Sequence, residues 1–339
     1  MPSAAKILPV RWASGKAGNF SNCMKRHVTR QVIKPMKKLL LLIGGPKCGT
    51  TSLSRWLDSI EPFCLHPQKE PGHFRSGERR FIKDAHKEEI TFLPRLSDQE
   101  YIRQFDVTKR FSILVDASTD YLSDHESPQL VKSFAIRHGF ELFVVIVLRD
   151  PIERAYSEYL HTIRDGLEIS SFQESLRLEP QRIERGFQPL FFHARRSKYY
   201  SDVKRWTSAF PERAVIISFA DIQDTLKLSE KLKGFLGHDG LRANPVPHHN
   251  KSSSGSRFPG HFPNLSRFIS LTRRVSPELA IAWEKKLSRR LWRKFRLTEA
   301  DKLSAFERLR TDIERCIADP TFPTNDWHTS LGFLKKDPF

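Results

Sequence analysis

The sequence predicts an α/β fold, in which a central parallel sheet is flanked by helices. Short apolar runs recur along the chain between polar or turn residues, which is typical of buried parallel strands. Helix-length segments separate these runs, and an alternation of strands with helices is the pattern of an α/β sheet. With 339 residues, the chain has room for one large domain of this kind or two small ones.

The predicted elements follow one another along the chain. Strands are expected at residues 39–44, 112–117, 141–148 and 213–219, with a shorter one at 62–66. Helix-length segments lie at residues 51–60, 98–106, 127–138, 151–165, 197–209 and 225–236. From residue 265 onward the pattern is again helical. Residues 238–264 are rich in Gly, Pro, Ser and Asn without periodicity, and a loop of that length is more often functional or disordered than a plain connection.

The basic balance of the chain favours anionic partners. There are 57 Lys and Arg residues against 39 Asp and Glu, a formal charge of +18. Nucleic acid, a membrane surface, a polyanionic polysaccharide and a phosphate-rich cofactor all suit such a charge. No apolar run approaches the length of a transmembrane helix, and the N-terminus lacks the apolar core of a signal peptide. We therefore expect a soluble, cytoplasmic protein without a membrane span.

The N-terminal segment differs from the rest of the chain in charge. Residues 1–36 contain no acidic residue, since the first one is Asp58. We expect this basic segment to be a flexible tail; an organelle transit peptide and a later start, at Met24 or Met36, are the alternatives. The remaining residues, 37–339, are expected to form a single domain with a helical C-terminal region.

The cysteines and histidines indicate neither a disulfide scaffold nor a metal site. The four cysteines are scattered, with no C-x-x-C pair, which favours free thiols in a reducing compartment. The histidines do not follow H-E-x-x-H or a similar ligand spacing. The sequence therefore predicts a protein without a bound metal.

The loop after the first predicted strand has several features of an anion site. It reads GGPKCGTTS from Gly44 to Ser52 and passes directly into a predicted helix. Backbone N–H groups at a helix N-terminus attract anions through unsatisfied donors and the helix dipole. Lys47 adds a mobile positive charge. Three hydroxyl side chains follow it: Thr50, Thr51 and Ser52.

The position of the lysine separates two classes of phosphate ligand. A nucleotide-triphosphate loop reads G-x-x-x-x-G-K-[ST], whereas here Thr50 follows Gly49 and the lysine stands two positions before that glycine. The stretch PKCGTTSL resembles instead the 5′-phosphosulfate loop of the sulfotransferase family, P-K-[SCA]-G-T-T. That resemblance implies a P-loop NTPase-like, three-layer fold and, as sulfuryl donor, 3′-phosphoadenosine 5′-phosphosulfate (PAPS), which leaves as PAP without help from a metal. The cofactor contacts that it implies are Lys47, Cys48, Gly49, Thr50, Thr51 and Ser52.

A second motif follows the strand predicted at 141–148. In VIVLRDPIERAYSEYLHTI, Asp150 fits a helix N-cap, Pro151 the first helical position, and Glu153 the partner of a capping box. Six apolar residues then recur at helical spacing and predict a buried face: Ile152, Ala155, Tyr156, Tyr159, Leu160 and Ile163.

The same stretch resembles the 3′-phosphate element of sulfotransferases, R-D-P-x-x-R-x-x-S-x-Y. The resemblance assigns Arg149 and Ser157 to the 3′-phosphate of PAPS. An arginine at a strand end beside a helix N-terminus also suits a phosphate on physical grounds. The alternative is a Walker B strand that ends in a magnesium ligand, Asp150, although the Asp-Pro cap already accounts for that aspartate.

A third stretch, HPQKEPGHF at residues 66–74, resembles the K-E-x-x-F-F segment of the heparan sulfate and related carbohydrate sulfotransferases. Carried over, Glu70 is the general base that takes a proton from an acceptor hydroxyl or amine, with Lys69 nearby. Such a base needs a carboxylate within reach of the acceptor and a tuned pKa. His73 is the competing base, since cytosolic small-molecule sulfotransferases use a histidine. A solvated Lys-Glu pair without catalytic work is the remaining alternative.

Weaker similarities extend the resemblance along the chain. VDASTDYL, residues 115–122, is similar to the K-S-P-x-Y segment of the carbohydrate group, although Ala117 and Thr119 replace its lysine and proline. The block at 195–222 is similar to a later segment of the family with a pattern of Tyr, Trp and Phe-Pro, in which Trp206 and Phe210 are expected in the core. The predicted substrate contacts are Lys69, His73, Ser118 and Tyr199.

The resemblance ends near the stretch KSSSGSRF, residues 251–258. It lies where the family has a basic, glycine-containing loop that closes over the nucleotide. Lys251 and Arg257 are therefore added to the predicted cofactor contacts.

The leading hypothesis is a PAPS-dependent sulfotransferase, closest to the heparan sulfate and carbohydrate group and its bacterial relatives. We expect the acceptor to be a carbohydrate, as an acidic glycan or glycolipid, and not nucleic acid. Two alternatives belong to other classes of protein. A P-loop kinase or NTPase that uses Mg-ATP predicts a lysine where the chain has Thr50. A non-catalytic basic protein that binds glycan or nucleic acid accounts for the charge but not for two phosphate motifs.

Overall fold

The computed structural model describes residues 37–77, 79–82, 90–93, 95–105, 113–241, 276 and 295–336. Three predictions from the sequence lie outside these residues: the N-terminal tail at 1–36 and the cofactor contacts Lys251 and Arg257. Most of the predicted loop at 238–264 lies outside them as well.

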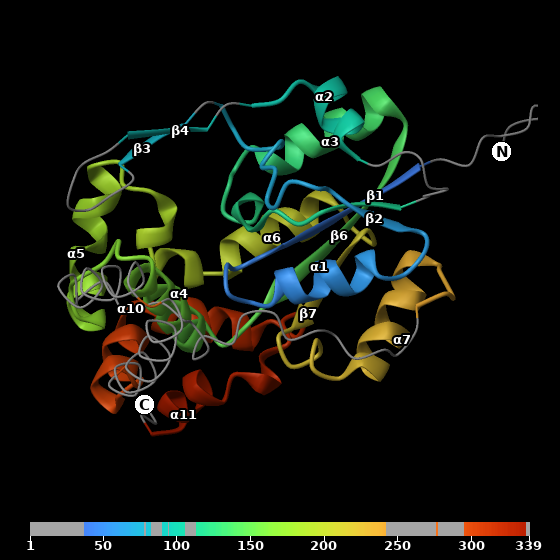
Figure 1. The fold of residues 1–339 in the computed structure, drawn as a ribbon. Coiled ribbons are helices and arrows are strands. Elements are labelled where there is room, and N and C mark those ends of the chain that lie inside the picture. The colour runs from blue at the N-terminus through green and yellow to red at the C-terminus, as the bar shows by residue number, and fades with distance from the viewer. Residues whose placement is uncertain are drawn as a thin grey trace, which may run out of the picture. The chain divides into compact units, whose positions relative to one another are not determined.

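A five-stranded parallel sheet forms the centre of the described domain (Figure 1). Its strands run in the order β2 (Phe63–Leu65), β5 (Ile113–Asp116), β1 (Lys37–Gly44), β6 (Phe140–Leu148) and β7 (Ala214–Ser218). Each lies where the sequence predicted a strand, and neighbours pair in parallel. Since β1 pairs with both β5 and β6, the strand order reverses at β1. Ligands of open α/β sheets bind at such a switch point, outside the carboxyl ends of the strands.

Helices cover both faces of the sheet because β1 buries side chains on both of its sides. Leu39 and Leu41 belong to one core cluster with residues of α3 and α6. Leu40 and Leu42 belong to another with residues of α1 and α7. This alternation is the period of two that a strand imposes. The bounds of these helices are α1 (Thr50–Asp58), α3 (Ser127–His138), α6 (Tyr200–Ala209) and α7 (Thr225–Leu236). The resulting three layers confirm the predicted fold class (Figure 1).

The other predicted helices are confirmed with small shifts at their ends. They are α2 (Asp98–Gln104) and α4 (Pro151–Arg164). The segment predicted as one helix at 197–209 instead divides into a short 3-10 turn, η3 (Arg195–Ser197), and α6. The predicted apolar face of α4 is buried, with only Leu160 partly exposed.

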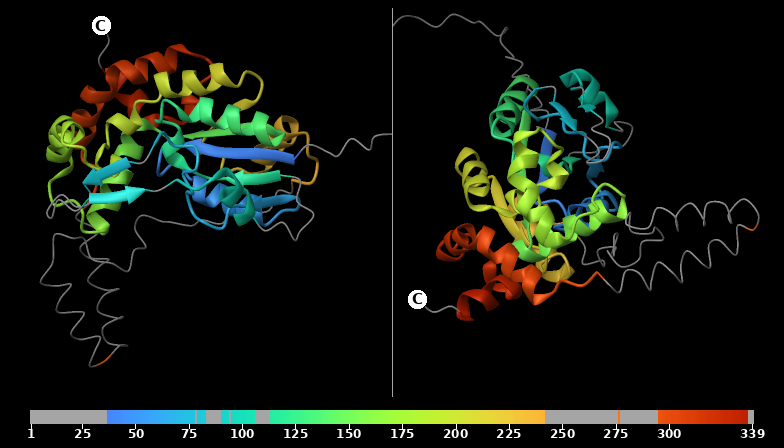
Figure 2. Two further views of the ribbon diagram at one scale, coloured as in Figure 1. Left: turned by 90° about the horizontal axis from the view of Figure 1, so that it is seen from above. Right: turned by 90° about the vertical axis from the view of Figure 1, so that its left-hand side faces the viewer.

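Among the described residues, two strands and one α-helix were not predicted from the sequence: β3 (Arg79–Ile82), β4 (Ile90–Leu93) and α5 (Phe172–Glu184). β3 and β4 form an antiparallel hairpin outside the main sheet. The N–H of Ile82 donates to the carbonyl of Gly186 and the N–H of Gln188 donates to the carbonyl of Ile82, both at 3.0 Å. These bonds join the hairpin to the segment after α5, beside which it lies in Figure 2.

The C-terminal region is helical, as predicted, over the residues that the structure describes. α10 (Glu299–Ala318) and α11 (His328–Lys336) pack against α4 in a third core cluster. Within the described ranges, no helix is both long enough and apolar enough to cross a membrane.

Candidate active site

The loop between β1 and α1 has the backbone of an anion site. Gly44 has a φ of 146°, and a Cβ added there would lie 2.2 Å from the carbonyl oxygen of Val147. Gly49 has a φ of 96° and begins α1, whose N-terminus receives no cap from a described side chain. The N–H groups of Ser52 and Leu53 donate to the carbonyl of Gly49, at 3.0 and 3.1 Å. The positive end of the helix dipole at this terminus favours an anion.

Lys47 stands in the same loop with a left-handed backbone, φ 72°. Residues other than glycine rarely adopt this conformation, which costs about 1–3 kcal/mol and persists only where the surroundings impose it. Burial, followed by the positive charge of Arg164, lowers the pKa of Lys47. Burial has already removed part of the hydration of this ammonium. An anion placed beside it would therefore stabilise its charge in place of the lost water.

The start of α4 is capped as predicted, with one correction. The carboxylate of Asp150 accepts the N–H groups of Ile152 at 3.0 Å and of Glu153 at 3.3 Å. It also accepts the N–H and the hydroxyl of Ser330 in α11, at 2.8 and 2.9 Å. The predicted capping box is wrong, because the side chain of Glu153 pairs at 3.0 Å with Arg149. A full positive charge is a stronger partner for a carboxylate than a neutral backbone N–H.

Arg149 and Ser157 occupy neighbouring positions at the end of β6 and in α4. The guanidinium of Arg149 lies 4.8 Å from the ring centre of Phe219, which follows β7. Its backbone carbonyl accepts the hydroxyl of Tyr199 at 3.1 Å. The stacking and the ion pair with Glu153 hold a planar cation at the carboxyl edge of the sheet, where it suits a phosphate.

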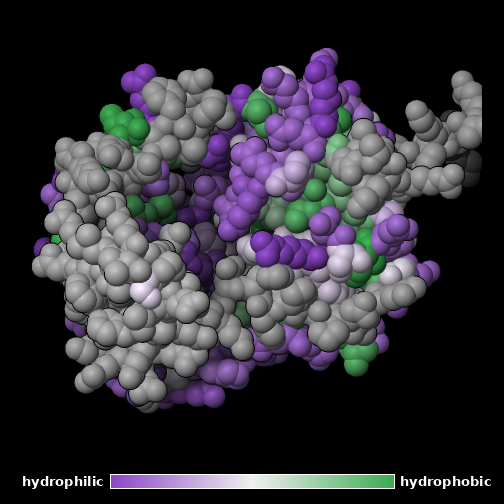
Figure 3. All heavy atoms as spheres, in the orientation of Figure 1, coloured by the Kyte–Doolittle hydropathy of each residue, from purple (hydrophilic) through white to green (hydrophobic). Residues whose placement is uncertain are grey.

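One cavity of about 710 Å³ brings most of the predicted site residues together. Those that line it are Lys47, Gly49, Thr50, Thr51, Ser52, Lys69, Glu70, Arg149 and Ser157. The lining comes from segments that follow the carboxyl ends of all five strands of the main sheet, as expected for a ligand site in this fold. Figure 3 shows the hollowed face of the molecule beside the start of α1, where hydrophilic residues gather.

The segment that carries Glu70 is held in place by the loop after β5. Glu70 itself has a left-handed backbone, φ 53°. Two residues further on, the N–H of Gly72 donates to the hydroxyl of Ser118 at 3.1 Å. Ser118 and Tyr121 in turn donate to the carboxylate of Asp116, at 2.7 and 2.9 Å. Burial raises the pKa of Asp116 to about 6, in spite of these hydrogen bonds. The hydrogen bonds of the loop after β5 thus support the segment in which Glu70 has its strained backbone.

The carboxyl group of Glu70 is exposed and lines the cavity. Desolvation by the surrounding protein atoms, followed by the negative charge of Asp120, raises its pKa. Lys69 and Arg196 oppose that rise, as does the hydroxyl of Thr119, which donates to Glu70 at 3.2 Å. A carboxyl with a raised pKa is a better proton acceptor than a free one once it is ionised.

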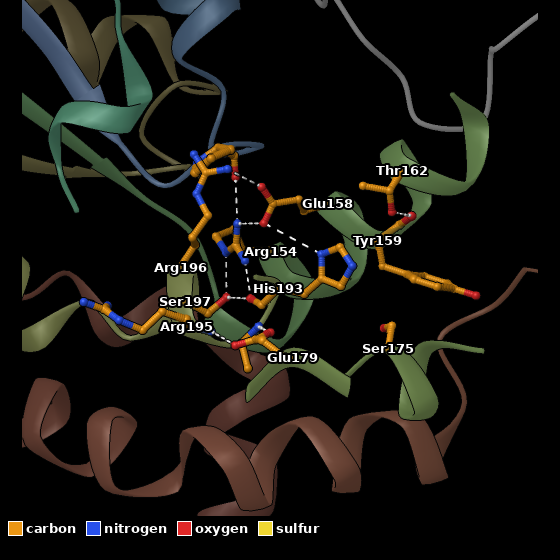
Figure 4. A network of polar contacts seen from close by, with 12 residues as sticks. Arg154, Glu158, Tyr159, Thr162, Ser175, Glu179, His193, Arg195, Arg196 and Ser197 are labelled. Atoms are coloured by element: carbon orange, nitrogen blue, oxygen red, sulfur yellow. Dashed lines mark hydrogen bonds and ion pairs between the residues drawn. The ribbon is translucent and has the colours of Figure 1, made fainter. Parts of the chain in front are cut away.

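A buried chain of charges borders the cavity (Figure 4). The carboxylate of Glu158 pairs with Arg154 and with Arg196, each at 2.7 Å. Burial alone would raise the pKa of Glu158, but the two guanidinium groups lower it to about 2. Arg154 also donates to the hydroxyl of Ser197 at 2.6 Å and reaches the carbonyl of Pro46 at 3.5 Å. The chain therefore ties α4 to η3 and to the loop that carries Lys47.

His73, the competing base, lies outside the lining of the cavity. Its ring is buried and stacks on Tyr101 at 4.3 Å between ring centres. Its Nε2 contacts the carboxylate of Asp98 at 3.0 Å. Burial lowers the pKa of His73 to about 4. The structure thus gives this histidine a place in an aromatic core and not beside Glu70.

Three further predicted residues also lie behind the cavity wall and not in it. Cys48 and Tyr199 are fully buried, and their sulfur and hydroxyl oxygen lie 3.7 Å apart. Ser118 is buried as well and uses its hydroxyl on Gly72 and Asp116. The contacts that the structure shows for these residues are internal, and they support the loops that carry the cavity-lining residues.

Several lining residues were not assigned a role from the sequence: Phe81, Asp120, Glu158, Arg164, Arg196 and Phe219. One signal could have found Arg164, since Ser157, His161 and Arg164 recur at helical spacing on one side of α4. His161 lines the cavity, and burial, followed by the charge of Lys47, lowers its pKa to about 4. The other residues are far apart in sequence, and only the fold brings them together.

Comparisons with known proteins identify the family of the chain. The family model of the sulfotransferase domain matches residues 37–254, more than half of the chain, and the chain belongs to this family. The predictions of a sulfotransferase, and thus of an enzyme, are confirmed.

Solved structures add a similarity of fold. A sulfotransferase from Alicyclobacillus acidocaldarius is 26% identical, with a TM-score of 0.54, over 73% of this chain and 94% of the other. A mouse sulfotransferase complexed with PAP is 15% identical, with a TM-score of 0.38, over 72% of this chain and 86% of the other. A search of curated protein sequences found no match.

Proposed function

We propose that this sulfotransferase moves a sulfuryl group from PAPS to a hydroxyl or amine of a carbohydrate. One observation carries the proposal: the anion loop with Lys47, the residues Arg149 and Ser157, and the carboxyl of Glu70 all line one cavity. We call the loop from Gly44 to Ser52, together with Arg149 and Ser157, the donor side.

The donor side fits a ligand with phosphate at both ends of a nucleoside. The positive N-terminus of α1 and the ammonium of Lys47 suit the 5′-phosphosulfate. Arg149 and Ser157, on a separate segment of the same cavity, suit the 3′-phosphate. When bound, PAPS supplies the sulfuryl group and departs as PAP. Lys251 and Arg257 remain proposed contacts of the same cofactor.

The chain's own residues divide the work of transfer between them. Glu70 accepts the proton of the acceptor O–H or N–H, as the freed electron pair forms a bond to sulfur and the bond from sulfur to the bridging phosphate oxygen breaks. That oxygen keeps the electrons of the broken bond, and Lys47 neutralises the charge that grows there. The cavity holds the reacting groups together, so that proximity lowers the barrier further.

The acceptor side of the cavity carries both charge and apolar surface. We define it by Lys69 and Arg164 on one hand and Phe81, Pro189 and Leu190 on the other, all of which line the cavity. A sugar ring presents apolar faces and polar edges, and sulfate or carboxylate substituents suit the two cations. The proposal therefore favours an acidic glycan or glycolipid. The cytoplasmic location stays a prediction from the sequence.

The Mg-ATP alternative is weakened by the engagement of Asp150. A Walker B aspartate needs a carboxylate that is free to reach the metal, but Asp150 accepts hydrogen bonds from Ile152, Glu153 and Ser330. Among the described residues, no group of three or more His, Cys, Asp or Glu side chains could hold a metal ion. The alternative of a non-catalytic basic protein does not explain Glu70, which has a strained backbone and lines the cavity.

A transfer assay with radiolabelled PAPS and a panel of sulfated and uronic acid-containing glycans tests the proposal. Lys47→Ala should cost about 2.7–4 kcal/mol of transition-state stabilisation, or about 10²–10³-fold in rate, if it acts like a preorganised oxyanion donor. Lys198→Ala removes an exposed lysine outside the cavity and should leave the rate unchanged. Full activity of Lys47→Ala would remove the proposed role of the loop.

A further inference from the structure

Glu70 shares the cavity with a second acidic side chain, Asp120, which no motif of the sequence singled out. Asp120 belongs to η1 (Thr119–Tyr121), the turn that follows β5. Its carboxylate meets Nη2 of Arg196 at 2.5 Å. Arg196 also lines the cavity, and its Nη1 is held at 2.7 Å by Glu158. An ion pair from two separate elements thus borders the proposed base.

We propose that Asp120 and Arg196 are positioning residues, which hold the carboxyl group of Glu70 between an acidic and a basic neighbour and so tune it as a base. The proposal rests on the role of Glu70 in the proposed function. In this role the pair acts on the carboxyl group of Glu70, whereas a purely structural salt bridge would only hold the two elements together.

The positional part of this role follows from the hydrogen bonds of η1. Thr119, the residue before Asp120, donates its hydroxyl to Glu70 at 3.2 Å. The orientation of η1 therefore decides where that hydroxyl points. Arg196 grips η1 through Asp120 and is itself fixed by buried Glu158. Because Glu158 also binds Arg154, the hold on Glu70 is anchored in the same chain that supports the donor side.

The electrostatic part follows from the opposite signs of the pair. Desolvation is the largest cause that raises the pKa of Glu70, and the charge of Asp120 is the next; Lys69 and Arg196 lower this pKa. The other charged or titratable side chains of the cavity are Lys47, Arg149, Glu158, His161 and Arg164. Loss of the aspartate removes a negative neighbour and also releases the charge of Arg196, and both changes favour the ionised base. Loss of the arginine does the reverse.

The two partners of one salt bridge should therefore move the same group in opposite directions. A purely structural salt bridge gives a different result, because breaking it from either end produces the same disorder and the same direction of change. The sign of the two shifts separates the roles.

The experiment is a pH titration of the Glu70 carboxyl by NMR, in the full chain labelled with ¹³C at the glutamate side-chain carboxyls. The Glu70 signal is the one lost in Glu70→Gln. In Asp120→Asn its midpoint should move to lower pH, and in Arg196→Gln to higher pH. Glu141→Gln and Arg213→Met break an ion pair of equal length, 2.5 Å, away from the cavity lining, and should leave the midpoint in place.

Each outcome bears on the proposal. Opposite shifts support it; an unmoved midpoint in Asp120→Asn, or shifts of equal sign, would overturn it. If Arg196→Gln does not fold, Asp120→Asn decides alone, since Asp120 is partly exposed and its loss leaves buried Glu158 paired with Arg154 and Arg196. PAP release from PAPS by Glu70→Gln is measured separately. Unreduced release would reject Glu70 as the base and leave the titration result intact, so the two failures are distinguishable.

Discussion

The donor side and the acceptor side of the cavity are built in different ways. The donor side follows directly from two inner strands: the loop to Ser52 continues β1, and Arg149 ends β6 just before α4. The acceptor side takes Phe81 from a hairpin outside the main sheet and Pro189 and Leu190 from a turn after α5. The difference indicates that the donor side is built on the main sheet, whereas the apolar wall of the acceptor side is built on elements outside it.

Glu70 stands between the two sides and depends on both. The segment that carries Glu70 is hydrogen-bonded through Gly72 to Ser118, and Ser118 is hydrogen-bonded to the buried carboxylate of Asp116. Through Arg196 and Glu158, the turn beside it is linked to Arg154 under the donor loop. A base in this position can be aligned with the donor by the core and approached by the acceptor from the wall that Phe81, Pro189 and Leu190 form.

The largest effect is expected from breaking the buried chain at Arg154, because both sides rest on it. Arg154→Met leaves the carboxylate of Glu158 buried with only one of its two cations, and removal of one partner of a buried pair costs about 3–5 kcal/mol. Urea unfolding measures the loss. Arg213→Met breaks an ion pair whose arginine is half exposed, and should cost about 0–1 kcal/mol. Equal losses of unfolding free energy in the two variants would show that the buried chain of charges supports neither side of the cavity.

A smaller effect is expected from acid, which protonates the same chain. The pKa of Glu158 is lowered to about 2 from an ordinary 4.5, so the unfolded chain takes up its proton at higher pH than the folded one. The stability that Glu158 contributes is complete above pH 4.5 and is lost as the pH falls toward 2. Urea unfolding at a series of pH values should show this loss. Glu158→Gln should flatten the dependence, whereas Glu314→Gln, in a partly exposed pair, should retain it.

The smallest effect is expected at the acceptor wall. Phe81→Ala removes one aromatic face, worth about 0.5–1.5 kcal/mol, and should raise KM for the glycan acceptor by about 2–10-fold. Calorimetry should find PAP affinity unchanged, because the ring stands outside the donor side. Weaker PAP binding with an unchanged acceptor KM would erase the distinction between the two sides.

The same distinction explains what the sequence could predict. The five strands and the donor motifs are contiguous stretches, in which strand, glycine turn and helix cap follow one another and can be read locally. The strands at 79–82 and 90–93 are short, and the sequence between them contains none of the Asn-Gly or Asp-Gly pairs that indicate a tight hairpin turn. Helix α5 contains an internal proline, Pro180. Both were missed because long-range contacts, such as those of Ile82, stabilise them.

The candidate site was predictable to a similar extent. Lys47, Arg149, Ser157 and Glu70 meet in one cavity as the resemblance implied. Asp120 could not be found from the sequence, because only the fold brings Arg196, 76 positions away, to its carboxylate. His73 shows the opposite failure. A histidine beside a catalytic motif suggests chemistry, but its pattern of aromatic neighbours exists only in the folded protein.

We expect the donor side to bind a 3′-phosphorylated adenosine nucleotide without metal. Calorimetric titration of the full chain with PAP, with and without EDTA, against ATP with magnesium tests it most directly. We predict tight, EDTA-insensitive binding of PAP that Arg149→Ala weakens by about 10–150-fold, as expected for hydrogen bonds to a charged group worth about 1.5–3 kcal/mol. A preference for Mg-ATP, or PAP binding that Arg149→Ala leaves unchanged, would contradict the account.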